Sequence, residues 1–472
     1  MSDTPKLDFL FAPQSIAVVL RSRGLGGFFL KQLVEGDFDG QVYAVCADAD
    51  ELMGLPCYKS VIDIPGPVDY VIIAVSANQT PDVIRECALK GVKAGTLFTA
   101  GFSELGTDEG IALEREIVSI AQGGGMRLIG PNCMGIYCPG GGLYFSANLP
   151  SARGWFGISS QSGGNAIYLG KMAPRRGAPI SKAVSYGNAC DINESDLIEY
   201  LAEDTETQVI GAYIEGIKDG RRFKKVLEKA ARAKPTIILK GGATAAGAAV
   251  TQSHTASLAG SLRIWDAVIA QTGALQAGSI DEIIDLALLF GYMKPPAGRR
   301  IGMVGIGGGI SVLAADAFEQ KNLSLTRLTP AIQARLQDLH PGAGNIYTNP
   351  IDTTALFYQT DGFRKTIEIL DDWDEIDIIL LHVPYDILAF LTPEHVRHLA
   401  MAEKMIGNIG SVRKPVAMLL HCAALKESYE LSFDNQDVCW KAGIPAFTSI
   451  EGCASALDKF IRFHERKAAL KN

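Results

Sequence analysis

One histidine of this sequence stands in a setting that suits catalysis. His254 lies in the small, polar segment Gln252-Ser253-His254-Thr255, and a stretch of glycine, alanine and threonine at 241–247 precedes it. This composition predicts a loop rather than an apolar helix face. The imidazole could act as a general base, a metal ligand or a phosphoryl acceptor. A metal is disfavoured, because no second histidine or cysteine lies nearby at ligand spacing.

Three glycine-bearing turns could bind an anion. The segments 21–27, 157–165 and 305–311 each follow an apolar run and precede a helix-spaced segment. Backbone N–H groups and the helix dipole at such turns can hold phosphate, although an ordinary structural turn is the alternative each time. The first turn is a weak dinucleotide fingerprint, since the third glycine position is Phe29. The second lacks the glycine that a nucleophile elbow carries two residues before Ser162.

Two acids follow apolar runs that we expect to be strands. Glu215 comes directly after the run 209–214, and parallel sheets bind ligands at that end of their strands. A carboxylate there could fix the tautomer of a histidine. Asp48 lies past the second run, where a ribose-binding acid could stand. The other histidines, including the pair His395 and His398, are interpreted as incidental.

Short apolar runs alternate with helix-spaced segments along the chain. Runs such as 15–19, 70–75 and 376–381 are rich in valine and isoleucine, without the polar alternation of a half-exposed strand. Strands buried on both faces have this pattern. We therefore expect an α/β protein with parallel sheets and helices on both sides. Breaks near 138–154 and 292–298 predict three domains, at 1–140, 150–290 and 298–472.

The composition argues against several classes of protein. Of 472 residues, 47% are hydrophobic and 20% charged, which is too apolar for intrinsic disorder. A net charge of −8 without a basic run argues against nucleic-acid binding. The sequence has no apolar run long enough for a spanning helix and no signal-like N-terminus. We therefore expect neither a membrane span nor secretion. Nine scattered cysteines without a C-x-x-C pair indicate reduced thiols in the cytoplasm.

Taken in order, these segments resemble the ADP-forming (NDP-forming) acyl-CoA synthetases, and more specifically their α subunit, a relative of the succinyl-CoA synthetase α chain. The sequence G-P-N-C-M-G at 130–135 is close to a family signature. Ser-Gln-Ser-Gly at 160–163 matches the start of the family's phosphate-binding helix, and Ser-His-Thr at 253–255 matches its histidine motif. Further matches, at 10–19, 184–191, 213–221, 307–309 and 349–352, extend the resemblance over nearly the whole chain.

The resemblance implies a Rossmann-like CoA-binding domain followed by two flavodoxin-like ligase domains. An acyl-CoA and phosphate would exchange to an acyl phosphate and CoA, and the phosphoryl group would pass to His254 and then to a nucleoside diphosphate. Glu215 would orient His254. The implied phosphate-binding residues are Ser160, Ser162, Gly163, Gly164, Gly307, Gly308 and Gly309. The implied CoA-binding residues are Ser22, Arg23, Gly24, Gly26, Val45, Val75, Ser76, Thr99, Asn132 and Cys133, with no metal site on this chain.

A second subunit is also implied. None of the printed sequence resembles an ATP-grasp portion, so we expect ATP or ADP and Mg²⁺ to bind to an ATP-grasp β subunit in an α2β2 hetero-oligomer. The acyl substrate, the choice between ADP and GDP, and the physiological direction stay open. The alternatives are a CoA-binding acyl- or carbamoyltransferase-type homologue, against which His254 argues, and a CoA-sensing protein without ligase activity.

The sequence departs from the family pattern in its first domain. The loop that begins at Leu20 is shorter than usual, and Cys46-Ala47-Asp48 replaces the favoured N-P-K. An acid therefore stands where a lysine could meet CoA phosphates, and we expect Arg21 and Arg23 to supply positive charge instead. A nucleophilic Cys133 is a further alternative, disfavoured because most buried cysteines are inert.

Overall fold

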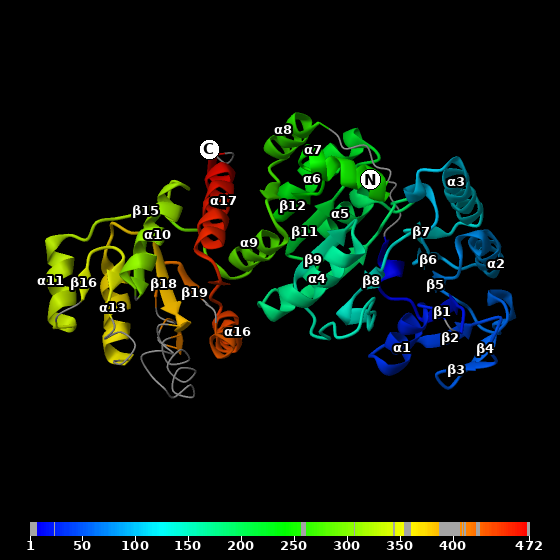
Figure 1. Ribbon diagram of the computed structural model, residues 1–472, viewed down its shortest axis with the longest axis horizontal. Coiled ribbons are helices and arrows are strands. Elements are labelled where there is room, and N and C mark those ends of the chain that lie inside the picture. The colour runs from blue at the N-terminus through cyan, green and yellow to red at the C-terminus, as the bar shows by residue number, and fades with distance from the viewer. Residues whose placement is uncertain are drawn as a thin grey trace. The chain divides into compact units, whose positions relative to one another are not determined.

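The computed structural model describes residues 7–22, 24–255, 261–305, 307–342, 345–353, 360–386, 406–407, 409, 412–421 and 425–469, with the backbone alone for 251–255 and 360. Their contacts divide the chain into two compact units. Unit 1 comprises Met1–Pro174 and Pro179–Ile280, and unit 2 comprises Arg175–Ala178 and Asp281–Asn472. Figure 1 labels most of the helices and strands of both units. No described helix is long and apolar enough to cross a membrane.

The first sheet of unit 1 has the strand order of a dinucleotide-binding fold. Its seven described strands lie in the order β3-β4-β2-β1-β5-β6-β7, and only β3 is antiparallel to its neighbour. The order reverses between β1 and β5, where such sheets bind ligands beyond the strand ends. The strands are β1 (Ser15–Leu20), β2 (Gln41–Val45), β3 (Glu51–Leu52), β4 (Leu55–Tyr58), β5 (Tyr70–Ala74), β6 (Ala94–Leu97) and β7 (Arg127–Ile129), and the α-helices are α1 (Gly27–Glu35), α2 (Thr80–Lys90) and α3 (Asp108–Gly123).

The second sheet of unit 1 is flavodoxin-like. Its described strands lie in the order β13-β12-β11-β9-β10-β8. β8 is antiparallel to β10, and the five parallel strands reverse their order between β9 and β11. The strands are β8 (Gly135–Tyr137), β9 (Phe156–Ser160), β10 (Ile180–Ser185), β11 (Val209–Ile214), β12 (Thr236–Lys240) and β13 (Leu275–Ala277). The helices are α4 (Gly163–Arg175), α5 (Glu194–Glu203), α6 (Gly220–Ala233), α7 (Ala245–Thr255) and α8 (Leu262–Thr272).

Unit 2 is built on a third, mostly parallel sheet. Its described strands lie in the order β16-β17-β14-β18-β19-β20, and β15 also pairs with β14. The strands are β14 (Arg300–Gly305), β15 (Ser324–Leu325), β16 (Ile346–Tyr347), β17 (Ile351–Asp352), β18 (Ile378–Pro384), β19 (Val416–His421) and β20 (Ala446–Phe447). The helices are α9 (Ile280–Tyr292), α10 (Gly308–Glu319), α11 (Pro330–Leu339), α13 (Thr360–Asp372), α16 (Lys426–Lys441) and α17 (Ile450–Ala469).

The three sheets confirm the predicted α/β class, and the burial of the strand residues explains why the sequence pattern predicts it. All six residues of β1 are buried, as are all seven of β18, so both strands read as continuous apolar runs. Helix α9 packs within unit 2, where the Phe290 ring lies 5.0 Å from that of Phe460 on α17. The boundary at 290 between two predicted domains stays a prediction. The contacts instead divide the chain after Ile280 and place nearly all of α9 with the third sheet.

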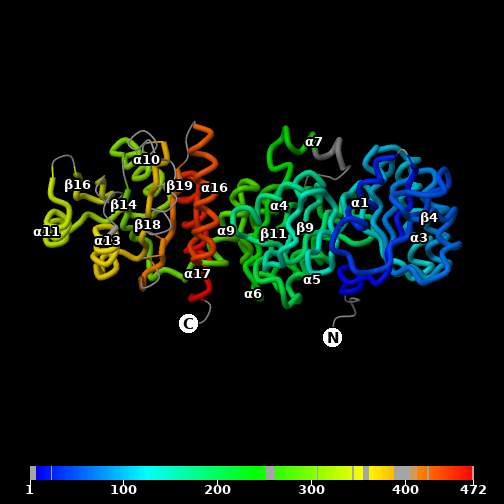
Figure 2. Tube along the Cα trace, turned by 90° about the horizontal axis from the view of Figure 1, so that it is seen from below, coloured from blue at the N-terminus to red at the C-terminus, as the bar shows by residue number. Residues whose placement is uncertain are grey.

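The segment that carries His254 is helical, so the predicted loop is wrong for residues 245–255. Helix α7 begins after Thr244, whose Oγ1 accepts the Gly247 N–H at 3.0 Å and whose carbonyl oxygen accepts the Ala248 N–H at 2.7 Å. Alanine has the highest helix propensity, and it outweighs the small, polar character on which the loop prediction rested. Figure 2 shows α7 at the edge of unit 1, and the His254 side chain lies outside the described residues.

Candidate active site

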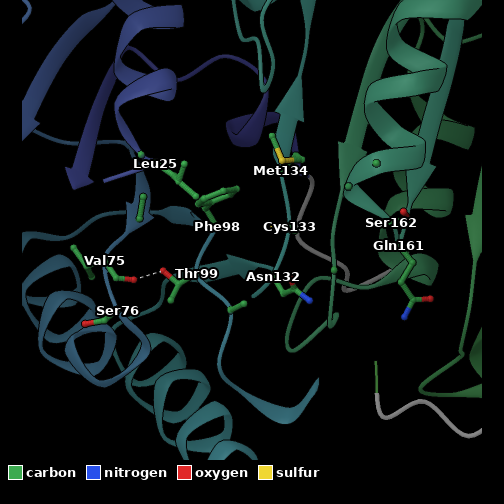
Figure 3. Close-up of a pocket in the computed structure, with 16 residues that line it drawn as sticks. Leu25, Val75, Ser76, Phe98, Thr99, Asn132, Cys133, Met134, Gln161 and Ser162 are labelled. Atoms are coloured by element: carbon green, nitrogen blue, oxygen red, sulfur yellow. Dashed lines mark hydrogen bonds between the residues drawn. The ribbon is translucent and has the colours of Figure 1, made fainter. Parts of the chain in front are cut away.

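A cavity of about 630 Å³ lies in unit 1 at the ligand-binding ends of both sheets. Figure 3 shows residues of the two sheets facing each other across it. Its lining comes from the turn before α1, the ends of β5 and β6, the loop from β7 to β8, the turn between β9 and α4, and Gly187 after β10. The cavity therefore joins the predicted CoA segment to the predicted phosphate turn. None of the sixteen described lining residues carries a charged side chain.

The loop with the G-P-N-C-M-G sequence connects the two sheets and forms one wall of the cavity. It leaves the first sheet at β7 and enters the second at β8. The Asn132 N–H donates to the Thr99 carbonyl oxygen at 2.9 Å, and the Met134 N–H donates to Ser185 Oγ at 3.1 Å. A Cβ at Gly187 would lie 2.2 Å from the Pro131 carbonyl oxygen, so only glycine allows this close approach.

The first sheet contributes the opposite wall. Thr99 Oγ1 donates to the Val75 carbonyl oxygen at 2.6 Å and joins the ends of β5 and β6, as the dashed line in Figure 3 marks. A Cβ at Gly26 would lie 2.5 Å from the Ala74 Cβ, which accounts for glycine at the start of α1. Both contacts lie where the strand order of this sheet reverses, which is the expected ligand crevice.

The turn before α4 presents a helix N-terminus to the same cavity. Ser162 Oγ accepts the Asn165 N–H at 3.3 Å, and its carbonyl oxygen accepts the Ser160 hydroxyl at 2.8 Å. Ser162, Gly163 and Gly164 line the cavity, and the glycines place no side chain between the backbone and this space. The positive end of the helix dipole and such backbone N–H groups favour an anion.

Gln161 fixes this turn to the strand end that carries Glu215. Its Oε1 accepts the backbone N–H groups of Glu215 at 2.8 Å and Gly216 at 3.0 Å. Because the oxygen is committed to these donors, the amide Nε2 is available to donate into the cavity, which Gln161 lines. Gln161 was absent from the predicted site residues, although it stands inside the predicted turn.

Glu215 is buried behind Gln161 rather than in the cavity lining. Its backbone carbonyl oxygen accepts from Lys240 Nζ at 2.7 Å, and burial lowers the pKa of Lys240. Burial, and then the neighbouring Glu215 carboxylate, raise the pKa of the Tyr213 hydroxyl. Helix α7 lies next to the 3₁₀ turn at Ser103–Leu105, shortly after the lining residue Thr99. The orienting role of Glu215 toward His254 stays a prediction.

Cys133 lines the cavity as an inert thiol. Its side chain is 3% exposed, and Sγ donates to the Leu97 carbonyl oxygen at 3.5 Å. Burial raises its pKa to about 12, so the thiolate that a nucleophile needs is scarce at neutral pH. This argues against the alternative of a nucleophilic Cys133.

The first loop is held by the acid that replaces the family's lysine. Asp48 Oδ1 accepts from Cys46 Sγ at 2.9 Å and from the Ser22 N–H at 3.0 Å, and these hydrogen bonds lower the Asp48 pKa to about 2. Arg21 Nε lies 3.9 Å from Asp48 Oδ2, so part of its charge is offset by the acid. Arg23 lies outside the described residues.

The third glycine turn lies in unit 2, between β14 and α10. Gly307 is the N-cap of α10 with φ of 108°, and its N–H donates to Asp352 Oδ1 at 3.1 Å. A Cβ at Gly308 would lie 3.7 Å from Asp352 Oδ2, so the carboxylate stands directly at this helix N-terminus. The turn therefore already has an anion beside it.

Comparisons with known proteins agree on the family. A family model described as a CoA binding domain matches residues 14–139, and one described as a succinyl-CoA ligase like flavodoxin domain matches 153–290. Acetate–CoA ligase [ADP-forming] II subunit alpha of Pyrococcus furiosus is 36% identical over 454 residues, covering 95% of this chain and 96% of the relative. This chain belongs to the ADP-forming acetate–CoA ligase family. The resemblance found in the sequence is thus confirmed.

Two further members of the family extend the comparison. Acetate–CoA ligase [ADP-forming] I of Archaeoglobus fulgidus is 36% identical over 407 residues, which cover 85% of this chain and 57% of that relative. A solved structure of "dinucleotide forming acetyl-coenzyme A synthetase 1" from Ca. Korarchaeum cryptofilum, in complex with phosphate and ADP, is 30% identical with a TM-score of 0.81. It matches 98% of this chain and 97% of that chain.

The predicted site residues fall into three groups, while Arg23 and the His254 side chain lie outside the described residues. Nine lie together in the cavity lining: Gly26, Val75, Ser76, Thr99, Asn132, Cys133, Ser162, Gly163 and Gly164. Ser22, Gly24, Val45, Ser160 and Glu215 lie outside the lining, and Gly307, Gly308 and Gly309 belong to unit 2. The lining residues absent from the prediction are mainly apolar, among them Leu25, Phe98 and Met134. Among the described residues, no cluster of histidine, cysteine or acidic side chains could hold a metal ion.

Proposed function

We propose that this chain is the α subunit of an ADP-forming acyl-CoA ligase. Such an enzyme interconverts a carboxylate, CoA and ATP with an acyl-CoA, ADP and phosphate. One observation carries the proposal: a single cavity joins the CoA-binding segment to the α4 turn. A thioester and a phosphate ion must meet in one space if the acyl group is to pass between them.

The first step proposed for the cavity is acyl transfer. An oxygen of hydrogen phosphate attacks the thioester carbonyl carbon and a C–O bond forms as the C–S bond breaks. The proton of the hydrogen phosphate passes to the sulfur, which leaves as the CoA thiol. The α4 N-terminus and the Gln161 amide would hold the phosphate while the C–O bond forms. The buried, protonated Cys133 takes no covalent part.

The second and third steps would move the phosphoryl group. An imidazole nitrogen of His254 attacks the phosphorus of the acyl phosphate, and the carboxylate leaves. The phosphoryl group then passes from His254 to a terminal oxygen of ADP, giving ATP and free imidazole. Glu215 would position His254, and the α4 N-terminus would stabilise the phosphohistidine by about 0.3–2 kcal/mol, depending on burial.

The nucleotide step would take place on a partner. We expect an ATP-grasp β subunit that binds ATP or ADP with Mg²⁺, in an α2β2 assembly. The Pyrococcus relative is named a subunit alpha, and the Archaeoglobus relative is much longer than its matching part. The eight described cysteines are free thiols, which supports a place in the reducing cytoplasm. Arg21 would contribute to CoA binding, weakened by its Asp48 neighbour.

The proposal is tested by two separate measurements, of protein-bound phosphate label and of released CoA thiol. The chain is incubated with acetyl-CoA and radiolabelled phosphate, and protein-bound label that is labile to acid and stable to base is measured. We expect such label in the wild type and none in His254→Ala. Label that persists in His254→Ala contradicts the phosphohistidine.

The thiol assay replaces phosphate with arsenate, because the acyl arsenate that forms is a mixed anhydride and hydrolyses spontaneously, so that released CoA accumulates without nucleotide. We expect arsenate-dependent release by the chain. No label and no thiol release, with CoA still bound, would favour a CoA sensor instead.

A further inference from the structure

The position of the acyl group follows from the phosphate site. In an acyl phosphate, the carbonyl carbon is bonded directly to a phosphate oxygen, so the acyl chain starts about one bond from the anion. If the α4 turn holds the phosphate, the residue that covers this turn also meets the chain. A Cβ at Gly163 would lie 3.0 Å from Cγ and 3.8 Å from Sδ of Met134. Met134 is thus the side chain that an acyl group would reach first.

The described lining residues of the cavity offer no charge to a second carboxylate. Its polar lining side chains are neutral: Ser76, Thr99, Asn132, Gln161 and Ser162. A dicarboxylic acyl group would bring an anion next to the bound phosphate without a cation to pair it, and an unpaired charge in a concave site is costly. The lining therefore fits a neutral acyl group.

A second, apolar cavity lies directly behind Met134. Met134 lines both cavities, and the second one has a volume of about 20 Å³, room for about one methyl-sized group. Most of its wall is hydrocarbon, including Ile136, Leu143 and Phe145. Its hydroxyl groups are engaged, because Tyr70 is hydrogen-bonded to Thr96 and Tyr144 donates to Asp37 Oδ2 at 3.1 Å.

Met134 forms the partition between the two spaces, with aromatic rings beside it. Phe98 of the main cavity packs against Phe29 of the small one at a ring distance of 5.2 Å. Met134 itself is half-buried, unbranched and able to change rotamer. Removing its side chain would connect the small cavity to the main one.

We propose that Met134 sets the length of the uncharged acyl chain that this enzyme accepts. The inference rests on the proposed function, since it assumes that acyl transfer takes place at the α4 turn. A longer chain enters the apolar cavity only when Met134 is removed. In Met134→Ala, the occupant of that cavity is the hydrocarbon end of the longer acyl group.

The test compares thioesters of increasing length in the arsenate-dependent thiol assay. The wild type is expected to favour acetyl-CoA or butyryl-CoA over hexanoyl-CoA and to release little thiol from succinyl-CoA. Met134→Ala is expected to raise the hexanoyl-to-acetyl ratio of kcat/KM by about tenfold or more, in the range that one or two methylene groups contribute in an apolar pocket. Met134→Phe, which narrows the passage, should move the butyryl-to-acetyl ratio in the opposite direction.

Two further variants separate this effect from general disturbance. Met172→Ala removes a half-buried methionine of α4 that lines neither cavity, and the ratios should stay unchanged. Ile136→Phe added to Met134→Ala refills the apolar cavity and should reverse the gain. Thermal unfolding of each variant verifies the fold.

An active wild type whose ratios do not move in either Met134 variant overturns the inference alone, as does a preference for succinyl-CoA. No thiol release from any thioester overturns the proposed function and this inference with it.

Discussion

The α4 turn of unit 1 and the α10 turn of unit 2 follow the same sequence logic but present different environments. Each comes after a buried parallel strand, carries consecutive glycines and opens a helix. The α4 turn faces a cavity whose described lining residues carry no charged side chain, whereas the α10 turn has the Asp352 carboxylate 3.1 Å from the Gly307 nitrogen. Glycine spacing alone therefore does not decide whether a helix N-terminus is free to bind an anion.

The electrostatic difference favours the α4 turn as the phosphate site. A carboxylate at a helix N-terminus already compensates the dipole. A phosphate placed about 4 Å from such a carboxylate would meet a repulsion of about 4 kcal/mol per pair of unit charges at an effective dielectric constant of ~20. Gln161 supplies a neutral acceptor at the α4 turn, where Asp352 supplies a charged one at α10.

Making the α4 turn resemble the α10 turn should have the largest effect. Gln161→Glu keeps an acceptor for the Glu215 and Gly216 N–H groups but places a carboxylate in the cavity lining. We expect kcat/KM for arsenate in the thiol assay to fall about a hundredfold through like-charge repulsion, a loss of about 2.7 kcal/mol. A loss below about threefold would mean that phosphate binds away from Gln161.

The α10 turn differs also in the buried histidine beneath it. His382 on β18 is 2% exposed, and a Cβ at Gly305 would lie 2.8 Å from its Nδ1. Burial, and then His421, lower the His382 pKa to about 3. Between about pH 6.5 and pH 3, His382 is protonated in the unfolded chain and neutral in the folded chain. The contribution of neutral His382 to the free energy of unfolding is therefore fully present above about pH 6.5 and is lost as the pH falls.

His382→Leu should remove this part of the pH dependence. Between about pH 7.5 and pH 5, we expect the wild-type free energy of unfolding for unit 2 to fall by about 2 kcal/mol more than that of the variant. Urea unfolding at both pH values, followed through the tryptophans of unit 2, measures the difference. Equal pH dependence would show that His382 is protonated in the folded chain.

A matched pair of glycine substitutions compares access to the two turns. A Cβ at Gly164 would have Ser162 Oγ as its nearest neighbour at 4.0 Å, and one at Gly309 would have no described neighbour within 4 Å. Both alanine variants should therefore fold. Gly164→Ala places a methyl group in the cavity lining and should lower kcat/KM for arsenate about tenfold, while Gly309→Ala should change it less than twofold. Equal losses would remove the distinction between the turns.

The smallest expected effect comes from Asp352→Asn. The variant keeps an oxygen acceptor for the Gly307 N–H and removes the charge at the α10 turn. If acyl transfer takes place at the α4 turn, thiol release should stay within about twofold of the wild type. A tenfold rise would instead place phosphate beside Asp352 during acyl transfer.

The sheets and the glycine turns could be predicted because both depend on local sequence. β1 and β18 are buried throughout, which leaves a continuous apolar run in the sequence. The helix at His254 does not follow from the sequence pattern, because alanine beside glycine also suits a loop. Small side chains satisfy both descriptions, and helix propensity decided between them.

The partners of the turns could not be predicted, because they come from distant parts of the chain. Asp352 lies 45 residues after Gly307, and Gln161 meets Glu215 across 54 residues. Likewise, Met134 is one of several apolar residues until the fold places it over Gly163. The order of the strands in each sheet brings these pairs together, and local sequence patterns do not give that order.

The central claim is that acyl transfer to phosphate takes place in the cavity of unit 1, before and independently of the phosphohistidine. The most direct measurement is arsenate-dependent thiol release from acetyl-CoA by the full chain without nucleotide, in the wild type, His254→Ala and Gln161→Glu. We predict release by the wild type and by His254→Ala at similar rates, and loss of release in Gln161→Glu. Loss of release in His254→Ala, or full release by Gln161→Glu, would contradict the account.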